Sequence, residues 1–565
     1  MKILLSLLLV ASAFSAERLS RDLKNTPRTG SVDVLVQYAT TPTANDHDRI
    51  RTRGGALRKE LGVIRAASYQ LPAADLDRLA ADPTVTFVSR DRVVRGSLDF
   101  ALPTIGADIA QKSGYTGNGI AVAVIDSGVG KHDDLPNARV VYAESFLSGR
   151  RSLDDEYGHG THVAGIIGAA GGSVKGLAPK VNIVSLRVLD AQGLGTDSDV
   201  IEAIDRAIQL KDRYKIRVIN LSLGRPIFES YTTDPLCQAV EKAWLAGLTV
   251  VVAAGNDGRD STGGRNGYGT INSPGNHPLV ITVGAMKTMK TASRPDDRIA
   301  SYSSKGPTAL DHIVKPDLLA PGNQIISLRV RKSSLASDYP ANLVPNSYFR
   351  GSKDDADYLW LSGTSMATPM VSGAAVLLLD RDPKLTNDQV KARLMRSATK
   401  DFPQFSTATD PVTGQTFVSQ YDLFTVGAGY LNVAEALANT SRFTGRAPSP
   451  KATLTGKGKV QLVGTRNALW GDNALWGDSA SWSLNAIWGD NVFLRGGNAL
   501  WGDNALWGDN ALWGDRTAAG FNALWGDNAL WGDNALWGDN ALWGEAAKAP
   551  VSTQSARDIL IRGEN

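Results

Sequence analysis

The apolar pattern in the central part of the chain predicts buried strands. Short runs rich in valine and isoleucine occupy residues 120–126, 181–189, 218–223, 248–254 and 279–285. Such runs are typical of strands buried on both faces, as in parallel sheets. Helical spacing of apolar residues lies between them, at 197–210 and 235–247. Residues 103–440 are therefore expected to form an α/β domain, a three-layer sandwich around a mostly parallel sheet with right-handed crossovers.

Residues 17–96 alternate between strand-like and helix-like patterns in shorter segments. Strand-like patterns at 32–38, 68–72 and 84–94 are separated by a charged stretch at 45–61 and by a helix-like segment at 74–82. Such an alternation over about 80 residues predicts a small α+β domain in which strands pack against two helices.

The first 16 residues have the pattern of a secretory signal peptide. Lys2 precedes an apolar run from Ile3 to Val10, and small residues follow, with Ala13 and Ser15 spaced as a signal peptidase prefers. The run is too short to span a bilayer as a permanent anchor. The alternative is a buried strand or helix at the start of a domain. The signal interpretation predicts a secreted or extracytoplasmic protein, in the periplasm or at a cell surface.

A hexapeptide repeat dominates the C-terminal part of the chain. The sextet NALWGD, or a near copy, recurs over residues 467–545, after a linker at 441–466 and before an extension at 546–565. Eleven of the 13 tryptophans lie there. Alternate residues share a face in an extended chain, so a stacked β-solenoid with a tryptophan ladder is one hypothesis. The others are exposed indoles that contact polysaccharide or cell-surface material, and a disordered low-complexity tail.

Composition narrows the function classes. The net charge of the 565-residue chain is +3, too small to indicate a nucleic-acid partner. Cys237 is the only cysteine, so no intrachain disulfide can form, and its apolar neighbours at helical spacing indicate a buried core residue.

Four short motifs carry candidate chemistry. Asp126 ends the run VAVID, His159 begins HGTHVAG, Asn256 lies in AAGND and Ser365 lies in GTSMATP. A carboxylate, an imidazole and a hydroxyl are the reactive groups of a serine protease, and the chain order Asp, His, Ser is the order of subtilisin. Each of three residues has an alternative interpretation when it is considered alone. Asp126 could cap a turn after a strand, Ser365 could be a helix N-cap, and Asn256 could be a turn residue.

With these motifs, residues 103–440 resemble the subtilisin family of serine proteases. The resemblance implies that Asp126 orients His159, that His159 is the general base and that Ser365 is the nucleophile. It implies that the Asn256 amide and the Ser365 backbone N–H form the oxyanion hole. It also implies that residues 17–96 are a propeptide, a folding aid and inhibitor that is cut off, with the mature chain beginning near 95–100. An accessory domain that stays attached is the alternative.

The resemblance extends to substrate and cofactor. Two segments match the strands that flank a bound peptide, Gly193, Leu194 and Gly195 on one side and Ser222, Leu223 and Gly224 on the other. Leu189, Val200 and Leu223 are candidates for an apolar subsite. The expected partners are protein or peptide substrates and the chain's own propeptide, and a monomer is expected. Catalysis requires no cofactor. Structural calcium is left open, with Asp134 matching one ligand.

Several features depart from the family pattern. The loop at 166–175 is about two residues shorter than in subtilisin and lacks the segment that wraps its strong calcium site. Arg225 stands where a glycine is usual, and residues 331–358 form an insertion, so either is a candidate for narrowing specificity. His162 invites a metal-site interpretation, but its spacing from His159 is three rather than four and no glutamate follows His159, so a structural role is expected.

Two functions follow. The first is a secreted, autoprocessed serine endopeptidase with broad specificity and an apolar preference. The second is a surface interaction or adhesion protein in which the tryptophan-rich repeats are the main functional part.

Overall fold

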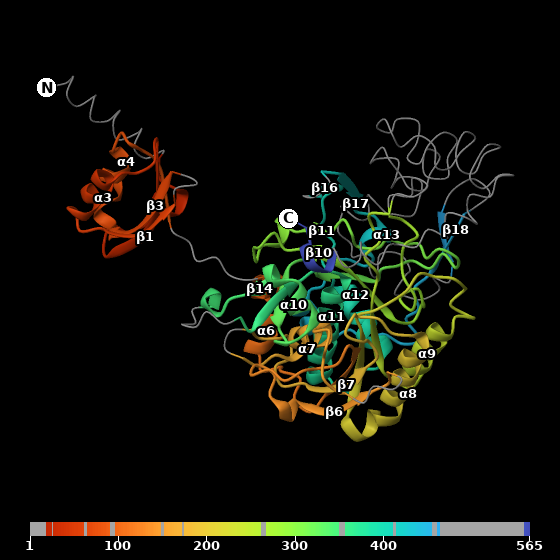
Figure 1. The fold of residues 1–565 in the computed structure, drawn as a ribbon. Coiled ribbons are helices and arrows are strands. Elements are labelled where there is room, and N and C mark those ends of the chain that lie inside the picture. The colour runs from red at the N-terminus through yellow and green to blue at the C-terminus, as the bar shows by residue number, and fades with distance from the viewer. Residues whose placement is uncertain are drawn as a thin grey trace. The chain divides into compact units, whose positions relative to one another are not determined.

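The computed structural model describes residues 18–24, 26–61, 65–90, 97–147, 152–171, 174–260, 267–349, 356–410, 414–454, 460–463 and 559–564. The chain forms two compact units, Met1–Val94 and Arg95–Asn565 (Figure 1). The predicted signal peptide at 1–16 and the repeats at 467–545 lie outside the described residues.

The N-terminal unit is built on a four-stranded antiparallel sheet. Its strands are β1 (Ser31–Tyr38), β2 (Ala56–Leu61), β3 (Ala66–Pro72) and β4 (Val85–Arg90), in the order β2-β3-β1-β4. Alternate residues of β1 are buried, and they share a core with the helix α4 (Leu76–Ala81). The helices α2 (Arg21–Lys24) and α3 (Ala44–Arg51) complete the unit. The predicted strands and the helix at 74–82 are present, whereas the charged stretch at 45–61 divides into α3 and β2.

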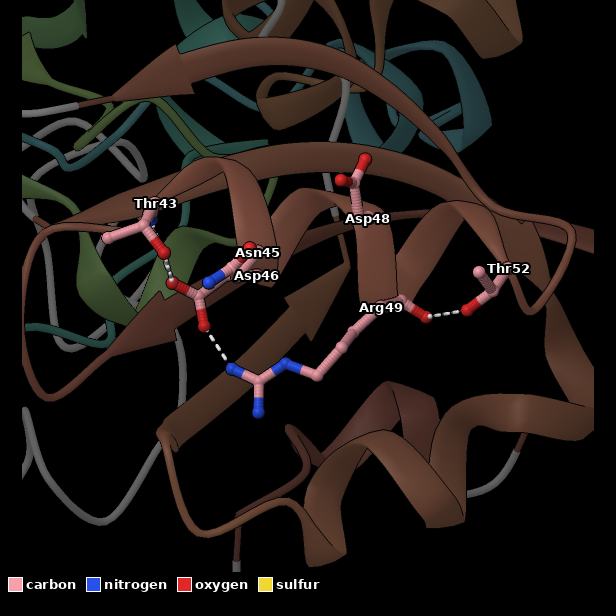
Figure 2. Close-up of a pocket in the computed structure, with 6 residues that line it drawn as sticks. All are labelled: Thr43, Asn45, Asp46, Asp48, Arg49 and Thr52. Atoms are coloured by element: carbon pink, nitrogen blue, oxygen red, sulfur yellow. Dashed lines mark hydrogen bonds and ion pairs between the residues drawn. The ribbon is translucent and has the colours of Figure 1, made fainter.

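The start of α3 is held by side-chain hydrogen bonds, which Figure 2 shows. The Asp46 carboxylate accepts hydrogen bonds of 2.7 Å from both the backbone N–H and the hydroxyl of Thr43, and it also contacts Arg49. At the other end of the helix, the Thr52 hydroxyl donates to the Arg49 carbonyl at 3.0 Å. These hydrogen bonds cap both ends of α3. The surface pocket that these residues line is therefore explained by helix capping.

The C-terminal unit contains an eight-stranded, mostly parallel sheet. Along it the order is β11-β10-β9-β8-β5-β7-β6, and β12 also pairs with β10; only β11 is antiparallel. Five strands match the predicted runs: β5 (Ala121–Asp126), β7 (Asn182–Arg187), β8 (Ile216–Leu221), β9 (Thr249–Ala253) and β10 (Ile281–Lys287). The sequence did not predict β6 (Val140–Ser145), β11 (Arg298–Ile299) or β12 (Leu318–Pro321).

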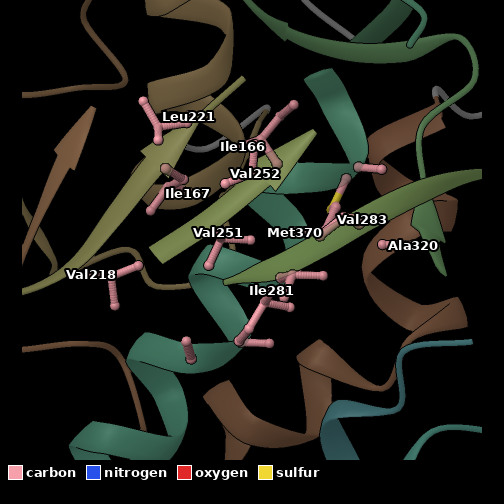
Figure 3. Packing of buried hydrophobic residues seen from close by; sticks show 14 of the residues in the cluster. Ile166, Ile167, Val218, Leu221, Val251, Val252, Ile281, Val283, Ala320 and Met370 are labelled. Atoms are coloured by element: carbon pink, nitrogen blue, oxygen red, sulfur yellow. The ribbon is translucent and has the colours of Figure 1, made fainter. Parts of the chain in front are cut away.

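Helices cover this sheet. The helices α7 (His159–Gly168) and α11 (Thr364–Arg381) pack against each other and against the strands, and so do α8 (Asp197–Tyr214) and α9 (Pro235–Leu245). Figure 3 shows Ile166 and Ile167 of α7 and Met370 of α11 in the core with valine and isoleucine side chains of β8, β9 and β10. All residues of β5, β9 and β10 are buried, as the continuous apolar runs predicted.

Smaller elements surround this core. The helices are α5 (Ser97–Thr104), α6 (Ala107–Lys112), α10 (Ser334–Asp338), α12 (Asn387–Ser397), α13 (Leu423–Val426) and α14 (Val433–Ala438). A three-stranded sheet joins β13 (Ile325–Leu328), β15 (Tyr358–Leu361) and β14 (Leu343–Val344). Two hairpins follow, β16 (Phe405–Thr409) with β17 (Thr416–Gln420) and β18 (Lys451–Leu454) with β19 (Val460–Val463). In the described part of the chain, no helix combines the length and apolarity needed to span a membrane.

Candidate active site

The predicted site residues gather where three neighbouring parallel strands end. In the sheet, β5 lies between β8 and β7. Asp126 is the last residue of β5, Ser222 follows β8 directly, and Gly193 lies in the loop after β7. Because the carboxyl ends of parallel strands meet at one sheet edge, this topology creates a crevice of the kind in which α/β proteins bind ligands.

Asp126 and His159 form a buried pair. His159 Nδ1 donates to Asp126 Oδ1 at 2.8 Å, and the Asp126 carboxylate is fully buried. Burial alone would lower the pKa of His159. The charge of Asp126, its hydrogen bond and the charge of Asp155 outweigh that effect, so the pKa of His159 is raised above its ordinary value. Because Nδ1 carries the donated proton, Nε2 of the neutral ring is left as the base.

A second carboxylate, Asp155, supports this pair and was missed by the sequence analysis. Asp155 is buried and accepts four hydrogen bonds of 2.6–2.8 Å, from the Ser127 hydroxyl, the Gly158 N–H, and the N–H and hydroxyl of Thr161. Burial raises the pKa of Asp155, and these hydrogen bonds oppose the rise. Asp155 therefore fixes the first turn of α7, which carries His159. No local sequence pattern indicated this role, because the Ser127 and Thr161 side chains that bind Asp155 lie on separate segments of the chain.

Ser365 is the one partly exposed residue between Thr364 and Leu379 of α11. Its hydroxyl donates to the Ser222 carbonyl at 3.0 Å, and the Ser222 hydroxyl donates to the Ser365 carbonyl at 2.8 Å. Among the hydrogen bonds of the described residues, none joins Ser365 to His159. The structure thus joins Asp126 with His159, and Ser365 with Ser222. Catalytic hydrogen bonds are often long in a free enzyme and shorten when substrate binds.

Asn256 contacts Thr364, the first residue of α11. Its Oδ1 accepts hydrogen bonds from the Thr364 N–H at 2.9 Å and from the Thr364 hydroxyl at 3.1 Å. A backbone N–H can only donate, so the oxygen of the Asn256 amide must face Thr364. This orientation leaves the Asn256 NH₂ group as a donor beside the Ser365 turn, in accordance with the predicted oxyanion role.

Comparison with known proteins identifies the family. The model of the subtilase family matches residues 117–427, more than half of the chain. The chain belongs to the subtilase family. It is 38% identical over 360 residues to serine protease AprX of Bacillus subtilis (strain 168), which covers 61% of this chain and 76% of AprX. It is 38% identical over 306 residues to subtilisin DY of Bacillus licheniformis, covering 54% of this chain and 92% of that protein.

A third relative, subtilisin E of Bacillus subtilis (strain 168), is 34% identical over 364 residues, covering 63% of this chain and 81% of subtilisin E. The family resemblance expected from the motifs is therefore confirmed. This subtilase is a subtilisin-like serine protease, a hydrolase that acts on protein substrates and needs no cofactor for catalysis.

The two predicted substrate-flanking segments of the subtilase lie in loops rather than in strands of the main sheet. In the first, the side chain of Leu194 is 59% exposed, and the Leu194 carbonyl accepts a hydrogen bond from the Asp190 N–H at 2.8 Å. In the second, Ser222 is buried and Leu223 packs against the core. A Cβ on Gly224 would lie 3.0 Å from the Ser273 carbonyl oxygen, so the loop runs close to a neighbouring segment.

Arg225 has intramolecular partners for its charge. Its guanidinium contacts Asp197 at 2.8 Å and the buried Asp234 at 3.0 Å, and its backbone pairs with that of Ser273. Asp197 begins α8 and Asp234 caps α9. Arg225 therefore ties the substrate-side loop to two helices, which gives it a structural role.

The insertion at 331–358 contacts two of the loops that border the crevice. The Ser334 N–H donates to the Glu156 carbonyl at 2.9 Å and the Ser334 hydroxyl donates to the Ala191 carbonyl at 2.7 Å. A Cβ on Gly158, whose φ is +99°, would lie 2.5 Å from the Ser333 hydroxyl oxygen. The insertion thus packs against the turn before His159 and against the loop that carries Leu194.

His162 has a structural role. Its Nε2 donates to the carbonyls of Ile325 at 3.0 Å and Leu359 at 3.2 Å, joining α7 to β13 and β15. Burial, then the neighbouring His159, lower the pKa of His162 to about 3, so the ring is neutral. Cys237 is buried as predicted, and burial raises the pKa of its thiol to about 12.

Asp134 has a protein partner for its carboxylate. The Tyr358 hydroxyl donates to Asp134 Oδ2 at 2.6 Å. Across the described ranges, no three histidine, cysteine, aspartate or glutamate side chains form a group that could hold a metal ion. Calcium requires six to eight oxygen ligands, and Asp134 alone does not provide them. A calcium site that includes Asp134 stays a prediction.

Proposed function

We propose that this subtilase is a secreted, autoprocessed endopeptidase with Asp126, His159 and Ser365 as its triad. The observation that carries the proposal is the buried Asp126–His159 hydrogen bond of 2.8 Å. It leaves Nε2 of His159 as the base, and the partly exposed Ser365 lies in the first turn of α11.

The proposed reaction begins with attack of the Ser365 hydroxyl on a peptide carbonyl. Before attack, the hydroxyl leaves the Ser222 carbonyl and turns to His159, which takes the proton at Nε2. Asp126 stabilises the imidazolium that forms, and the imidazolium then donates its proton to the leaving amine. The acyl-enzyme is hydrolysed by water, with His159 again acting as the base.

The oxyanion forms beside two donors in this proposal. One is the NH₂ group of Asn256, whose oxygen is held by Thr364, and the other is the backbone N–H of Ser365. Because the Asn256 amide is oriented before substrate arrives, it needs no reorganisation during the reaction.

The substrate is proposed to bind as an extended strand. Residues 193–195 and 222–224 lie at the carboxyl ends of β7 and β8, on either side of β5, and offer backbone groups for β-augmentation. The exposed Leu194 and the half-buried Leu189 and Leu223 support an apolar preference. The insertion at 331–358, rather than Arg225, is the feature placed to narrow that preference.

The N-terminal unit is proposed to be the propeptide. A separate compact unit ending at Val94 supports removal at a bond between the two units. Together with the signal pattern at 1–16, this arrangement supports secretion and self-maturation.

The test is Ser365→Ala in the full-length chain. The variant should accumulate as the uncut precursor and should not react with a serine-directed covalent inhibitor, whereas the parent should be labelled on Ser365. Ser113→Ala, at an exposed hydroxyl after α6, is the matched control and should mature normally. Normal processing of the Ser365→Ala chain would contradict self-maturation, and labelling at another serine would contradict the assigned nucleophile.

A further inference from the structure

Residues 559–564 belong to the unit Arg95–Asn565, hereafter the protease unit. Ile559, Leu560 and Ile561 are buried in the main hydrophobic core, and Glu564 is only 1% exposed. Figure 1 shows this blue segment beside β10 and β11. Residues 559–564, hereafter the C-terminal segment, follow the tryptophan repeats in sequence. They pack against residues that lie 198 to 305 positions earlier in the chain, from Ser362 to Arg259.

The Glu564 carboxylate has charged and polar partners inside the protein. Its Oε1 lies 3.2 Å from Nζ of Lys287, at the end of β10, and its Oε2 lies 3.5 Å from Nη2 of Arg259. Oε2 also accepts hydrogen bonds from the Ser301 N–H at 2.7 Å and the Ser301 hydroxyl at 3.0 Å. A buried carboxylate that contacts two cations and two hydrogen-bond donors occupies a preformed binding site.

The backbone of the C-terminal segment is recognised as well. The Asn323 side chain donates to the Glu564 carbonyl at 2.6 Å and accepts from the Glu564 N–H at 2.8 Å. The Ser362 N–H donates to the Leu560 carbonyl at 2.9 Å, and the Asn342 side chain donates to the Ile561 carbonyl at 2.6 Å. These donors come from three separate parts of the domain, and Ser362 lies three residues before Ser365.

A glycine is required within the segment. Gly563 has φ of +59°, and a Cβ at that position would lie 2.2 Å from the Ser362 hydroxyl oxygen. The sequence of this segment therefore matches the surface that binds it. The isoleucine and leucine side chains lie in the core, the glycine lies where the backbone approaches Ser362, and the glutamate carboxylate lies between two cations.

The chain is also attached to the protease unit just before the repeats. In β18 the Ala452 N–H donates to the His312 carbonyl at 2.8 Å, and β18 pairs with β19, which ends at Val463. Residues 464–558, which lie outside the described residues, connect Val463 to Ile559. Both ends of that connection are held by one compact unit.

We propose that the protease domain contains a binding site for the chain's own C-terminal segment, so that the domain holds the chain both before and after the repeats in sequence. The site recognises a short peptide with three buried aliphatic residues, one exposed residue, a glycine and a glutamate. The residues that hold the Glu564 side chain and backbone, Lys287, Ser301 and Asn323, are not among those assigned to the triad, the oxyanion hole or the substrate-flanking segments. The site therefore does not depend on the proposed proteolytic mechanism.

The test is amide hydrogen exchange, followed by mass spectrometry, on the full-length chain in the Ser365→Ala background, which prevents self-digestion. In the parent, the amides of Ser301, Ser362 and Glu564 should exchange slowly. Glu564→Gln should speed exchange at Ser301 and Ser362 at least about tenfold. The Ser301 N–H loses its charged acceptor, and release of the segment also removes the Leu560 carbonyl that accepts from the Ser362 N–H. Arg562→Gln is the matched control, since Arg562 is the exposed side chain of the same segment, and should behave as the parent.

A synthetic peptide of residues 555–565 added to the Glu564→Gln chain should restore slow exchange in a saturable way, and the same peptide carrying Glu564→Gln should not. Rapid exchange at 559–564 in the parent, or unchanged exchange at Ser301 and Ser362 in Glu564→Gln, would overturn the proposal. If the variant exchanges rapidly throughout, the peptide addition decides: renewed protection at Ser301 supports the site, and continued rapid exchange rejects it.

Discussion

Asn256 shows how one contact fixes the orientation of a side-chain amide. Its oxygen faces the Thr364 N–H, so Asn256→Ala removes both the acceptor for Thr364 and the proposed oxyanion donor. Asn256→Asp keeps an acceptor for Thr364 but removes the donor. Both variants should lose about 10²–10³ in kcat with little change in KM, the range known for removing one such donor from subtilisin. Steady-state kinetics on a peptide amide substrate checks this.

The comparison between the two variants separates catalysis from folding. If holding Thr364 were the only role of Asn256, Asn256→Asp would retain most of the activity while Asn256→Ala lost it. Near-parental kcat in Asn256→Asp would therefore contradict the oxyanion assignment.

Asp155 is a positioning residue whose charge acts on His159. His159 must be neutral to accept a proton, so its raised pKa places the acid limb of kcat/KM above pH 6.5. Asp155→Asn should move that limb to lower pH, because a negative charge that favours the imidazolium is lost. It should also cost about 1–3 kcal/mol of stability, since the amide NH₂ cannot accept from the Thr161 N–H.

The matched control for this pH profile is the neighbouring exposed residue, Asp154. Asp154→Asn removes the same formal charge at a solvated position, where water screens it, and should leave the acid limb in place. An unmoved acid limb in Asp155→Asn would show that Asp155 acts only on the structure of α7.

Among the elements, those with a clear apolar pattern could be predicted, whereas very short strands and strands without such a pattern could not. The strands β5 and β9 are buried throughout, so their valine and isoleucine runs had one interpretation. Every residue of β6 is half-buried, and its sequence VVYAES carries no clear period. The motifs around Asp126 and His159 predicted the buried pair, whereas Asp155 depends on contacts with Ser127 and Thr161 that no local pattern contains.

The joint between α7 and the small sheet β13-β15-β14 should weaken in acid. His162 is neutral in the fold because its pKa is about 3, while the unfolded chain binds a proton near pH 6.5. The contribution of His162 to the free energy of unfolding is therefore complete above pH 6.5, and it is lost as the pH falls from 6.5 toward 3. Between pH 7 and 4.5 this residue should account for about 2–3 kcal/mol of the loss.

Urea unfolding at both pH values, in the Ser365→Ala background, tests this expectation. His162→Gln keeps one donor for the Ile325 and Leu359 carbonyls but does not titrate in this range. The variant should be less stable than the parent at pH 7 and should lose less stability on acidification. Equal losses in the two chains would show that the acid sensitivity resides in other groups.

At the scale of the whole molecule, the protease unit extends further along the chain than its composition indicates. The composition changes after Pro448, yet Ser449 is buried and contacts both Asp317 and Lys391. The extension at 546–565 contains only one short apolar run, too short to show a period. Its packing depends on Lys287 and Ser301, more than 260 residues away in sequence, so it could not be predicted from local pattern.

These contacts change how the role of the repeats should be tested. A deletion of 449–565 would remove buried parts of the protease unit, so loss of activity would say nothing about the repeats. A deletion of 467–545 keeps both attached ends and leaves a 16-residue connection, residues 464–466 and 546–558, that can span up to roughly 50 Å. That chain should match the parent in peptide hydrolysis and thermal stability, because every described contact of the unit is retained.

A chain that ends at Val463 is the companion variant. It should lose about 3 kcal/mol or more of stability, because the burial of Ile559, Leu560 and Ile561 is lost together with the Glu564 ion pairs. Thermal unfolding of the three chains, with binding to insoluble polysaccharide and to cell surfaces, separates the roles. Lost binding with intact hydrolysis in the 467–545 deletion would make the repeats a targeting device, as the proposed contact of exposed indoles requires. Lost stability in that same chain would instead show that the repeats support the fold, and a stable chain ending at Val463 would contradict the role given to Glu564.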